Sequence, residues 1–140
     1  MSLVRILVVD DFDLWRDFII TQLQVCSNLH VVGFAADGLQ AIQKAEELQP
    51  DLVLLDMMLP KMIGIEAARH IRRVAPNCKI LFVSAEADLE LVRNAFQVGG
   101  SGYVLKMEGS AGLLAGIKAV LRGQRFVSPV LADSKDLTDL

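Results

Sequence analysis

Four short apolar runs in this chain each stop at a residue with acidic, hydroxyl or basic chemistry. The runs are rich in leucine and β-branched residues, and their length is typical of parallel strands that are buried on both faces. They cover residues 5–9, 52–55, 79–83 and 102–105, and the residues that follow them are Asp10 with Asp11, Asp56, Ser84 and Lys106. Ligands of open parallel sheets bind outside the carboxyl ends of the strands. The pattern therefore predicts that three carboxylates, a hydroxyl and an ammonium meet at one edge of a sheet.

Helical periodicity fills the segments between these runs, and one further run, at residues 30–35, also has the composition of a strand. The predicted helices span residues 14–25, 39–48, 65–74, 88–98 and 110–122. Asp13 and Ser110 are the expected N-caps of the first and last of them. Five βα units in succession, joined by right-handed crossovers, predict a doubly wound α/β fold with helices on both faces of a five-stranded parallel sheet.

Composition fits one domain of ordinary size, which we place at residues 4–122, with residues 123–140 as a tail or the start of a linker. The 140 residues are 53% hydrophobic and carry a net charge of −3, without a basic stripe. Nucleic-acid binding by this chain itself is therefore not expected. No apolar run reaches the roughly 18 residues of a membrane span. Cys26 and Cys78 lie far apart and are read as reduced thiols of a cytosolic protein.

The residues at the predicted strand ends suit phosphoryl transfer. An aspartate carboxylate can attack phosphorus and form an aspartyl phosphate. Asp10 and Asp11 offer the hard oxygen ligands that Mg²⁺ prefers. Lys106 could supply a positive charge to one phosphoryl oxygen, while the Ser84 hydroxyl donates a hydrogen bond to another. Each of these residues alone is weak evidence, but four strand ends that agree form a specific pattern.

At these residues the chain resembles the receiver domain of two-component response regulators, from about Val4 to Arg122. The motifs that carry the resemblance are Val8-Val9-Asp10-Asp11, the segment from Leu55 to Gly64, Val83-Ser84-Ala85, and Gly102-Tyr103-Val104-Leu105-Lys106. The resemblance implies a flavodoxin-like strand order of 2-1-3-4-5. It also implies a cytoplasmic protein that a histidine kinase or a phosphotransfer protein phosphorylates, and that is not an enzyme beyond its own phosphorylation and dephosphorylation.

The resemblance assigns roles residue by residue. Asp56 resembles the phosphoacceptor. Asp11, Asp56 and the backbone carbonyl of Met58 resemble the ligands of Mg²⁺, and Asp10 resembles the acid that acts through metal-bound water. The residues that resemble the phosphoryl-binding pair are Ser84 and Lys106, and Tyr103 falls at the aromatic switch position, where Ser84 is its partner.

The expected switch follows from these roles. Movement of Ser84 toward a phosphoryl group would vacate space into which Tyr103 can turn inward. The surface formed by residues 88–98, 102–105 and 110–122 would then change between two states.

Two positions depart from the family pattern. Met107 follows Lys106 where receivers often have a proline in a cis peptide, and we expect a trans bond because a non-proline cis bond costs about 2.5–4 kcal/mol. Ile63 replaces a small polar residue, which removes a helix cap. These departures concern loop geometry, and every acid of the pattern is present.

The last third resembles receivers that precede a LuxR/NarL-type helix-turn-helix domain. Its motifs are residues 112–117, 120–123 and 127–129. The chain is thus either part of a longer transcription factor, which would reach DNA only through an output domain outside this chain, or a stand-alone receiver that signals through protein–protein contacts. A homodimer is possible in both cases.

Two other classes share parts of the pattern. A flavodoxin would cradle an anionic FMN phosphate in its first loop, where Asp10 and Asp11 would repel it. A haloacid-dehalogenase-type phosphatase would use Asp11-Phe12-Asp13, but it also needs an acidic pair downstream of its lysine. The acids that remain for such a pair, Asp133, Asp136 and Asp139, all lie in the tail, so the order of residues favours the receiver.

Overall fold

A computed structural model describes residues 3–132 and shows one parallel sheet of six strands in the order β2-β1-β3-β4-β5-β6. The strands are β1 (Val4–Val9), β2 (Leu29–Ala35), β3 (Leu52–Leu55), β4 (Lys79–Ser84), β5 (Gly102–Leu105) and β6 (Phe126–Val127). The doubly wound α/β class and the order of the first five strands are confirmed. The predicted number of strands was five and is wrong, because β6 was not foreseen.

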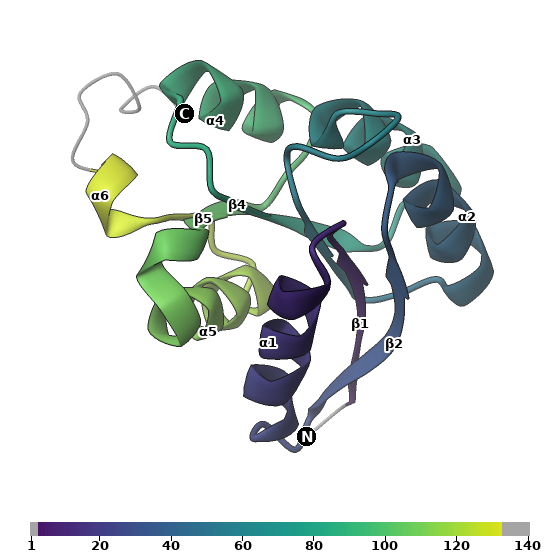
Figure 1. Cartoon of the computed structure of the whole chain (residues 1–140), viewed down its shortest axis with the longest axis horizontal. Coiled ribbons are helices and arrows are strands. Elements are labelled where there is room, and N and C mark those ends of the chain that lie inside the picture. Colours follow the sequence, from purple (N-terminus) through teal and green to yellow (C-terminus); the bar gives the residue numbers. More distant parts are fainter. Residues whose placement is uncertain (1–2, 133–140) are drawn as a thin grey trace.

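Helices cover both faces of the sheet (Figure 1). They are α1 (Asp13–Gln24), α2 (Gly38–Leu48), α3 (Gly64–Val74), α4 (Leu89–Gln97), α5 (Gly109–Leu121) and the short α6 (Pro129–Ala132), with a 3₁₀ turn, η1 (Lys106–Glu108), before α5. One apolar cluster lies between the sheet and α2, α3 and α4, and a second lies between the sheet and α1 and α5. The central strands β3 and β5 are buried along their whole length, as their continuous apolar sequences predict.

The register of the sheet brings the carboxyl ends of the central strands together. Val9 of β1 pairs with Leu55 of β3, and Leu55 pairs with Phe82 of β4. Ser84 of β4 pairs with Leu105 of β5. The polar residues that end these strands therefore lie along one edge, which is the predicted position of the site.

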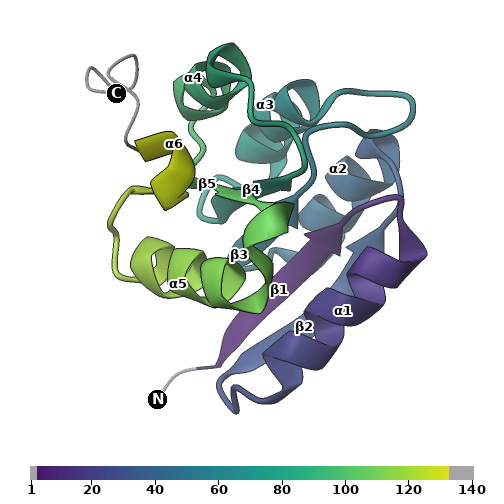
Figure 2. The same ribbon diagram turned by 60° about the vertical axis from the view of Figure 1, so that its left-hand side comes forward.

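The sixth strand completes the sheet with residues from the predicted tail. Phe126 and Val127 pair in parallel with the first two residues of β5. Ser128 follows with its side chain fully buried: its hydroxyl accepts a hydrogen bond from the backbone N–H of Leu105 at 2.8 Å. Leu131 of α6 then joins the core beneath α4, and α6 lies at the β5 edge of the sheet (Figure 2). The acidic residues from Asp133 onward lie outside the described residues.

Helix starts were predicted less well than strand ends. Asp13 is the first residue of α1 and pairs with Arg16, while Phe12 is the capping residue. Ser110 lies inside α5, which begins at Gly109. Both predicted caps are therefore wrong. Ile63 precedes α3 without a side-chain capping bond, as its apolar side chain requires.

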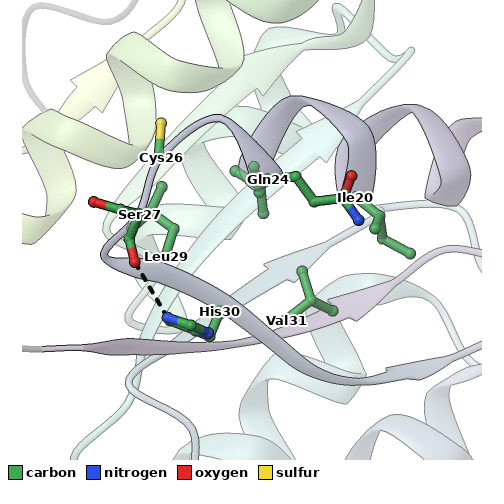
Figure 3. Close-up of a pocket in the computed structure, with 8 residues that line it drawn as sticks. Ile20, Gln24, Cys26, Ser27, Leu29, His30 and Val31 are labelled. Atoms are coloured by element: carbon green, nitrogen blue, oxygen red, sulfur yellow. Dashed lines mark hydrogen bonds between the residues drawn. The ribbon is translucent and has the colours of Figure 1, made fainter.

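A shallow hollow of about 330 Å³ lies at the turn between α1 and β2, at the opposite ends of the strands from the acids. Figure 3 shows its lining, in which a ring nitrogen of His30 lies 3.2 Å from the carbonyl oxygen of Ser27. None of the residues predicted to form the site lines this hollow. Among the residues that the structure describes, no helix combines the length and apolar character needed to cross a membrane.

We predict that Ser128→Ala lowers the free energy of unfolding by about 1–3 kcal/mol, since the Leu105 N–H would remain buried without its acceptor. Urea denaturation followed by circular dichroism measures this change. Ser27→Ala, at an exposed serine, is the matched control and should change stability little. Equal stability of the Ser128→Ala variant and the parent protein would contradict the inferred role of this bond.

Candidate functional site

Backbone pairing fixes the two buried acids beside each other. Asp10 and Asp56 each follow the last residue of a strand. The backbone N–H of Asp10 donates to the carbonyl of Ala35, and that of Asp56 donates to the carbonyl of Val9, at 3.0 Å in both cases. These bonds extend the pairing of the strands by one residue. The Asp10 carboxylate also accepts a hydrogen bond from the Phe12 N–H at 2.9 Å. This bond orders the turn into α1 and holds the Asp10 side chain over the edge of the sheet.

Three carboxylates gather at this edge. Asp10, Asp11 and Asp56 each offer an oxygen, and these oxygens all lie within 4.8 Å of one another. Asp10 and Asp56 are buried and Asp11 is exposed. Such a donor set fits a hard divalent cation like Mg²⁺, which binds few carboxylates and keeps several waters. The open side at Asp11 gives that cation a route from solvent.

Lys106 neutralises part of this negative charge. Its Nζ lies 2.6 Å from Oδ2 of Asp10 and 3.3 Å from Oδ2 of Asp56, and only 18% of its side chain is exposed. The residue begins η1 directly after β5, so the strand end fixes where the side chain starts. No peptide bond within residues 3–132 is cis, so the trans bond expected between Lys106 and Met107 is confirmed.

The environment of Asp56 opposes its ionisation. Burial is the largest cause, the nearby Asp10 carboxylate adds to it, and together they raise the pKa of Asp56 from 3.8 to about 6. The Lys106 ammonium and the Met58 N–H oppose this shift. A carboxyl with this pKa is still mostly ionised at neutral pH, as a nucleophile requires.

The loop after β3 wraps closely around Asp56. The Met58 N–H faces Oδ1 of Asp56 at 3.5 Å, while the Met58 side chain is exposed. Gly64 donates its N–H to the Met57 carbonyl at 2.6 Å, and a Cβ at Gly64 would lie 2.8 Å from Cα of Met57. Only glycine leaves room for this approach. On the outer side Lys61 reaches Asp37, with 3.3 Å between Nζ and Oδ2, which ties this loop to the start of α2.

Ser84 and Tyr103 form a second group beside the acids. The Ser84 hydroxyl accepts a hydrogen bond from the Glu86 N–H at 3.0 Å, and the Tyr103 hydroxyl donates to the Glu86 carbonyl at 2.7 Å. Tyr103 is fully buried and stacks on Phe82, with 6.2 Å between ring centroids. It therefore already lies in the inward position to which the sequence analysis expects it to turn.

The structure thus divides the predicted residues into two sets. Asp10, Asp11, Asp56 and Lys106 form one charged cluster, whereas the side chains of Ser84 and Tyr103 both contact the Glu86 backbone. Sequence reasoning missed the Glu86 carbonyl and the indole of Trp15, whose ring centroid lies 5.3 Å from the Lys106 Nζ. The helical position of Trp15, one turn after the acid pair, was the only available signal for the latter.

Comparison with known proteins agrees with this geometry. Residues 6–118 match the family of the response regulator receiver domain. The chain is 38% identical over 130 residues to the response regulator GacA of Pseudomonas viridiflava, an alignment that covers 93% of this chain and 61% of GacA. The chain thus spans about three fifths of the length of that relative.

Solved structures show the same fold. A two-component response regulator of the LuxR family from Aurantimonas sp. SI85-9A1 is 37% identical, with a TM-score of 0.89 and 94% of each chain covered. The signal receiver domain of the putative response regulator NarL from Mycobacterium tuberculosis is 29% identical, with a TM-score of 0.83; the match covers 89% of this chain and all of that one (100%).

The doubly wound fold, with acids and a lysine at its strand ends, is consistent with these matches to signalling domains. This chain belongs to the response regulator receiver domain family, as the sequence motifs predicted. Phosphorylation and Mg²⁺ binding are typical of that family. Within it, this chain is similar to response regulators of the LuxR and NarL types.

The raised pKa of Asp56 predicts a pH-dependent effect of Asp56→Asn in the absence of divalent cations. The folded state holds the Asp56 proton more tightly than the unfolded state, so ionised Asp56 destabilises the fold, and this cost develops between about pH 4 and about pH 6. Asp56→Asn should therefore raise the free energy of unfolding by about 2–3 kcal/mol above pH 6, and by little below pH 4.

Urea denaturation of both proteins across this pH range measures the difference. Asp17→Asn removes one exposed carboxylate from α1 and controls for the change in net charge. A gain from Asp56→Asn that is independent of pH, or that is matched by Asp17→Asn, would contradict the assigned cause.

Proposed function

We propose that Asp56 accepts a phosphoryl group, in a reaction that depends on Mg²⁺, from a histidine kinase or a phosphotransfer protein. The observation that carries this proposal is the position of the Asp56 carboxylate, which is buried beside the carboxylates of Asp10 and Asp11 and lies 3.3 Å from the Lys106 ammonium. A buried nucleophile that lies beside one cation and beside oxygen ligands for a second cation is arranged for charge stabilisation in phosphoryl transfer.

Each residue would have a distinct task. Asp11, one oxygen of Asp56 and the Met58 carbonyl would hold Mg²⁺, and Asp10 would bind its water. The bound cation would neutralise charge on the phosphoryl oxygens. Lys106 would move from Asp10 toward a phosphoryl oxygen, and it already contacts Asp56. Ser84 can donate its hydroxyl hydrogen to another oxygen while it accepts from Glu86.

The signal would leave the site through the Ser84, Glu86 and Tyr103 group. A new acceptor for Ser84 would change its contact with the Glu86 N–H, and the Glu86 carbonyl is the partner of Tyr103. Two arrangements of this segment would present different surfaces of α4, β5 and α5 to a partner, which is a population shift driven by differential contacts.

The output of this switch would be transcription. Relatives such as GacA are longer than this chain, and an output domain outside it would bind DNA, with a homodimer as one form of the active state. The site would act in the cytoplasm, where histidine kinases present their phosphoryl groups. The alternative is a stand-alone receiver whose partner binds the surface of α4, β5 and α5 directly.

The chain would not be an enzyme that turns over external phosphate esters. The order of residues supports this, because the acidic pair that a phosphatase of the rival class needs downstream of its lysine would have to come from the tail acids. Its catalysis would be limited to its own phosphorylation and dephosphorylation.

Labelling with a small phosphodonor tests the nucleophile. Acetyl phosphate with Mg²⁺ should add one phosphoryl group to the intact protein, and mass spectrometry should show that hydroxylamine removes it, as expected of an acyl phosphate. Asp56→Asn keeps the side-chain shape without the nucleophilic oxygen, so labelling should fall below detection.

Asp13→Asn, which changes an exposed acid at the start of α1, is the matched control and should label as the parent protein does. Labelling that persists in Asp56→Asn would refute the assignment of Asp56. Continuous hydrolysis of p-nitrophenyl phosphate would instead favour a phosphatase.

Mg²⁺ should also stabilise the fold, because a ligand that binds only the folded state raises its stability by mass action. At about ten times its Kd the cation would add about 1.4 kcal/mol to the free energy of unfolding. The melting temperature should therefore rise on addition of millimolar Mg²⁺. Asp11→Ala should remove most of this rise and Asp13→Ala should keep it, whereas a melting temperature indifferent to Mg²⁺ would count against the metal site.

A further inference from the structure

The indole of Trp15 forms one wall around the Lys106 ammonium. Trp15 lies in α1, one turn after the acid pair, and its ring centroid is 5.3 Å from the Lys106 Nζ. This distance is within the roughly 6 Å at which a cation is attracted to the face of an aromatic ring. The ammonium therefore has three neighbours: the Asp10 carboxylate, the Asp56 carboxylate and the face of the indole.

Packing fixes the position of the indole. Trp15 is half-buried against the apolar cluster between the sheet and α1 and α5, and its ring lies 4.9 Å from that of Phe18. Lysine, in contrast, has a flexible four-carbon stem, and its ammonium can take many positions at little cost. A fixed aromatic face beside the ammonium reduces that freedom.

The indole N–H argues that Trp15 does more than fill the core. Trp15 Nε1 is buried, and it has no hydrogen-bond partner among the residues that the structure describes. An unpaired buried donor costs free energy, and phenylalanine would fill much of the same space without that cost. What the indole offers in exchange is the strongest cation–π attraction among the aromatic side chains.

We propose that Trp15 is a positioning residue for Lys106 in the phosphorylation of Asp56. This inference rests on the proposed function. A water bound to Mg²⁺ would donate a hydrogen bond to the Asp10 carboxylate that Lys106 also contacts, so cation binding would loosen the 2.6 Å ion pair between Lys106 and Asp10. The face of Trp15 would then hold the ammonium near Asp56, where the phosphoryl oxygens arrive.

The rate of phosphorylation tests this role. With acetyl phosphate and Mg²⁺, Trp15→Leu should slow the labelling of Asp56 by roughly 2- to 30-fold, which corresponds to the usual range of cation–π energies. Trp15→Phe retains an aromatic face and should slow labelling less. In a Lys106→Met background, which has no ammonium to position, Trp15→Leu should have no further effect.

A matched control separates positioning from packing. Phe126 also packs against the α1 and α5 cluster, but it comes from β6 at the start of β5, away from Lys106. Phe126→Leu should leave the labelling rate near that of the parent protein. The proposal is overturned if Phe126→Leu slows labelling as much as Trp15→Leu does, or if Trp15→Leu slows it equally with and without Lys106.

A second measurement does not depend on phosphorylation. The ring current of Trp15 should shift the ¹³C–¹H resonance of the Lys106 ε-methylene, which Lys106→Met identifies by its absence. Trp15→Leu should move this resonance toward the values of exposed lysines, and Phe126→Leu should not. If the parent protein fails to label at all, the proposed function fails; if it labels but this resonance ignores Trp15→Leu, the positioning role alone is wrong.

Discussion

Repulsion between carboxylates is the constraint around which the site is built. Asp10, Asp11 and Asp56 bring their oxygens within 4.8 Å of one another, and Lys106 is the one ammonium that the structure places in direct contact with two of them. Like charges held this close disfavour ionisation, which is part of why the pKa of Asp56 is raised. The fold tolerates this cost because the backbone of β1 and β3, with its regular pairing, fixes the acids independently of their charge.

The same backbone connects the site to the rest of the molecule. β5 carries Tyr103 and runs directly into Lys106, and its outer edge binds the segment after α5 through β6 and the Ser128 hydroxyl. The segment of residues 126–128 is therefore bound to β5, the strand that ends directly before Lys106 of the site. A rearrangement of β5 would therefore change the position of residues 126–128 through these direct contacts.

Sequence patterns correctly predicted the buried strands, but they failed for the helix caps and for β6, which depend on local backbone geometry and pairing. The ends of β3 and β5 were correct because short apolar runs with both faces buried have few alternative positions. The caps Asp13 and Ser110 were wrong: an ion pair with Arg16 engages the first, and the glycine before the second allowed α5 to start earlier. β6 was missed because two residues show no periodicity, and its stability comes from pairing with β5 rather than from its own composition.

The sequence allowed the residues of the charged site to be predicted, but not which of the acids Lys106 contacts most closely. The positions of these residues at strand ends predicted that Lys106 lies near the acids. They did not predict that the shortest ion pair of Lys106 is with Asp10 rather than with Asp56. That choice has a consequence for mechanism. A metal-bound water on Asp10 would compete with Lys106 for the Asp10 carboxylate, and an ammonium released from Asp10 would still have Asp56 as a neighbour. In the proposed phosphoryl transfer, charge compensation would therefore come from Mg²⁺ and Lys106 together, and the 3.3 Å contact with Asp56 would keep the ammonium near the incoming phosphoryl group.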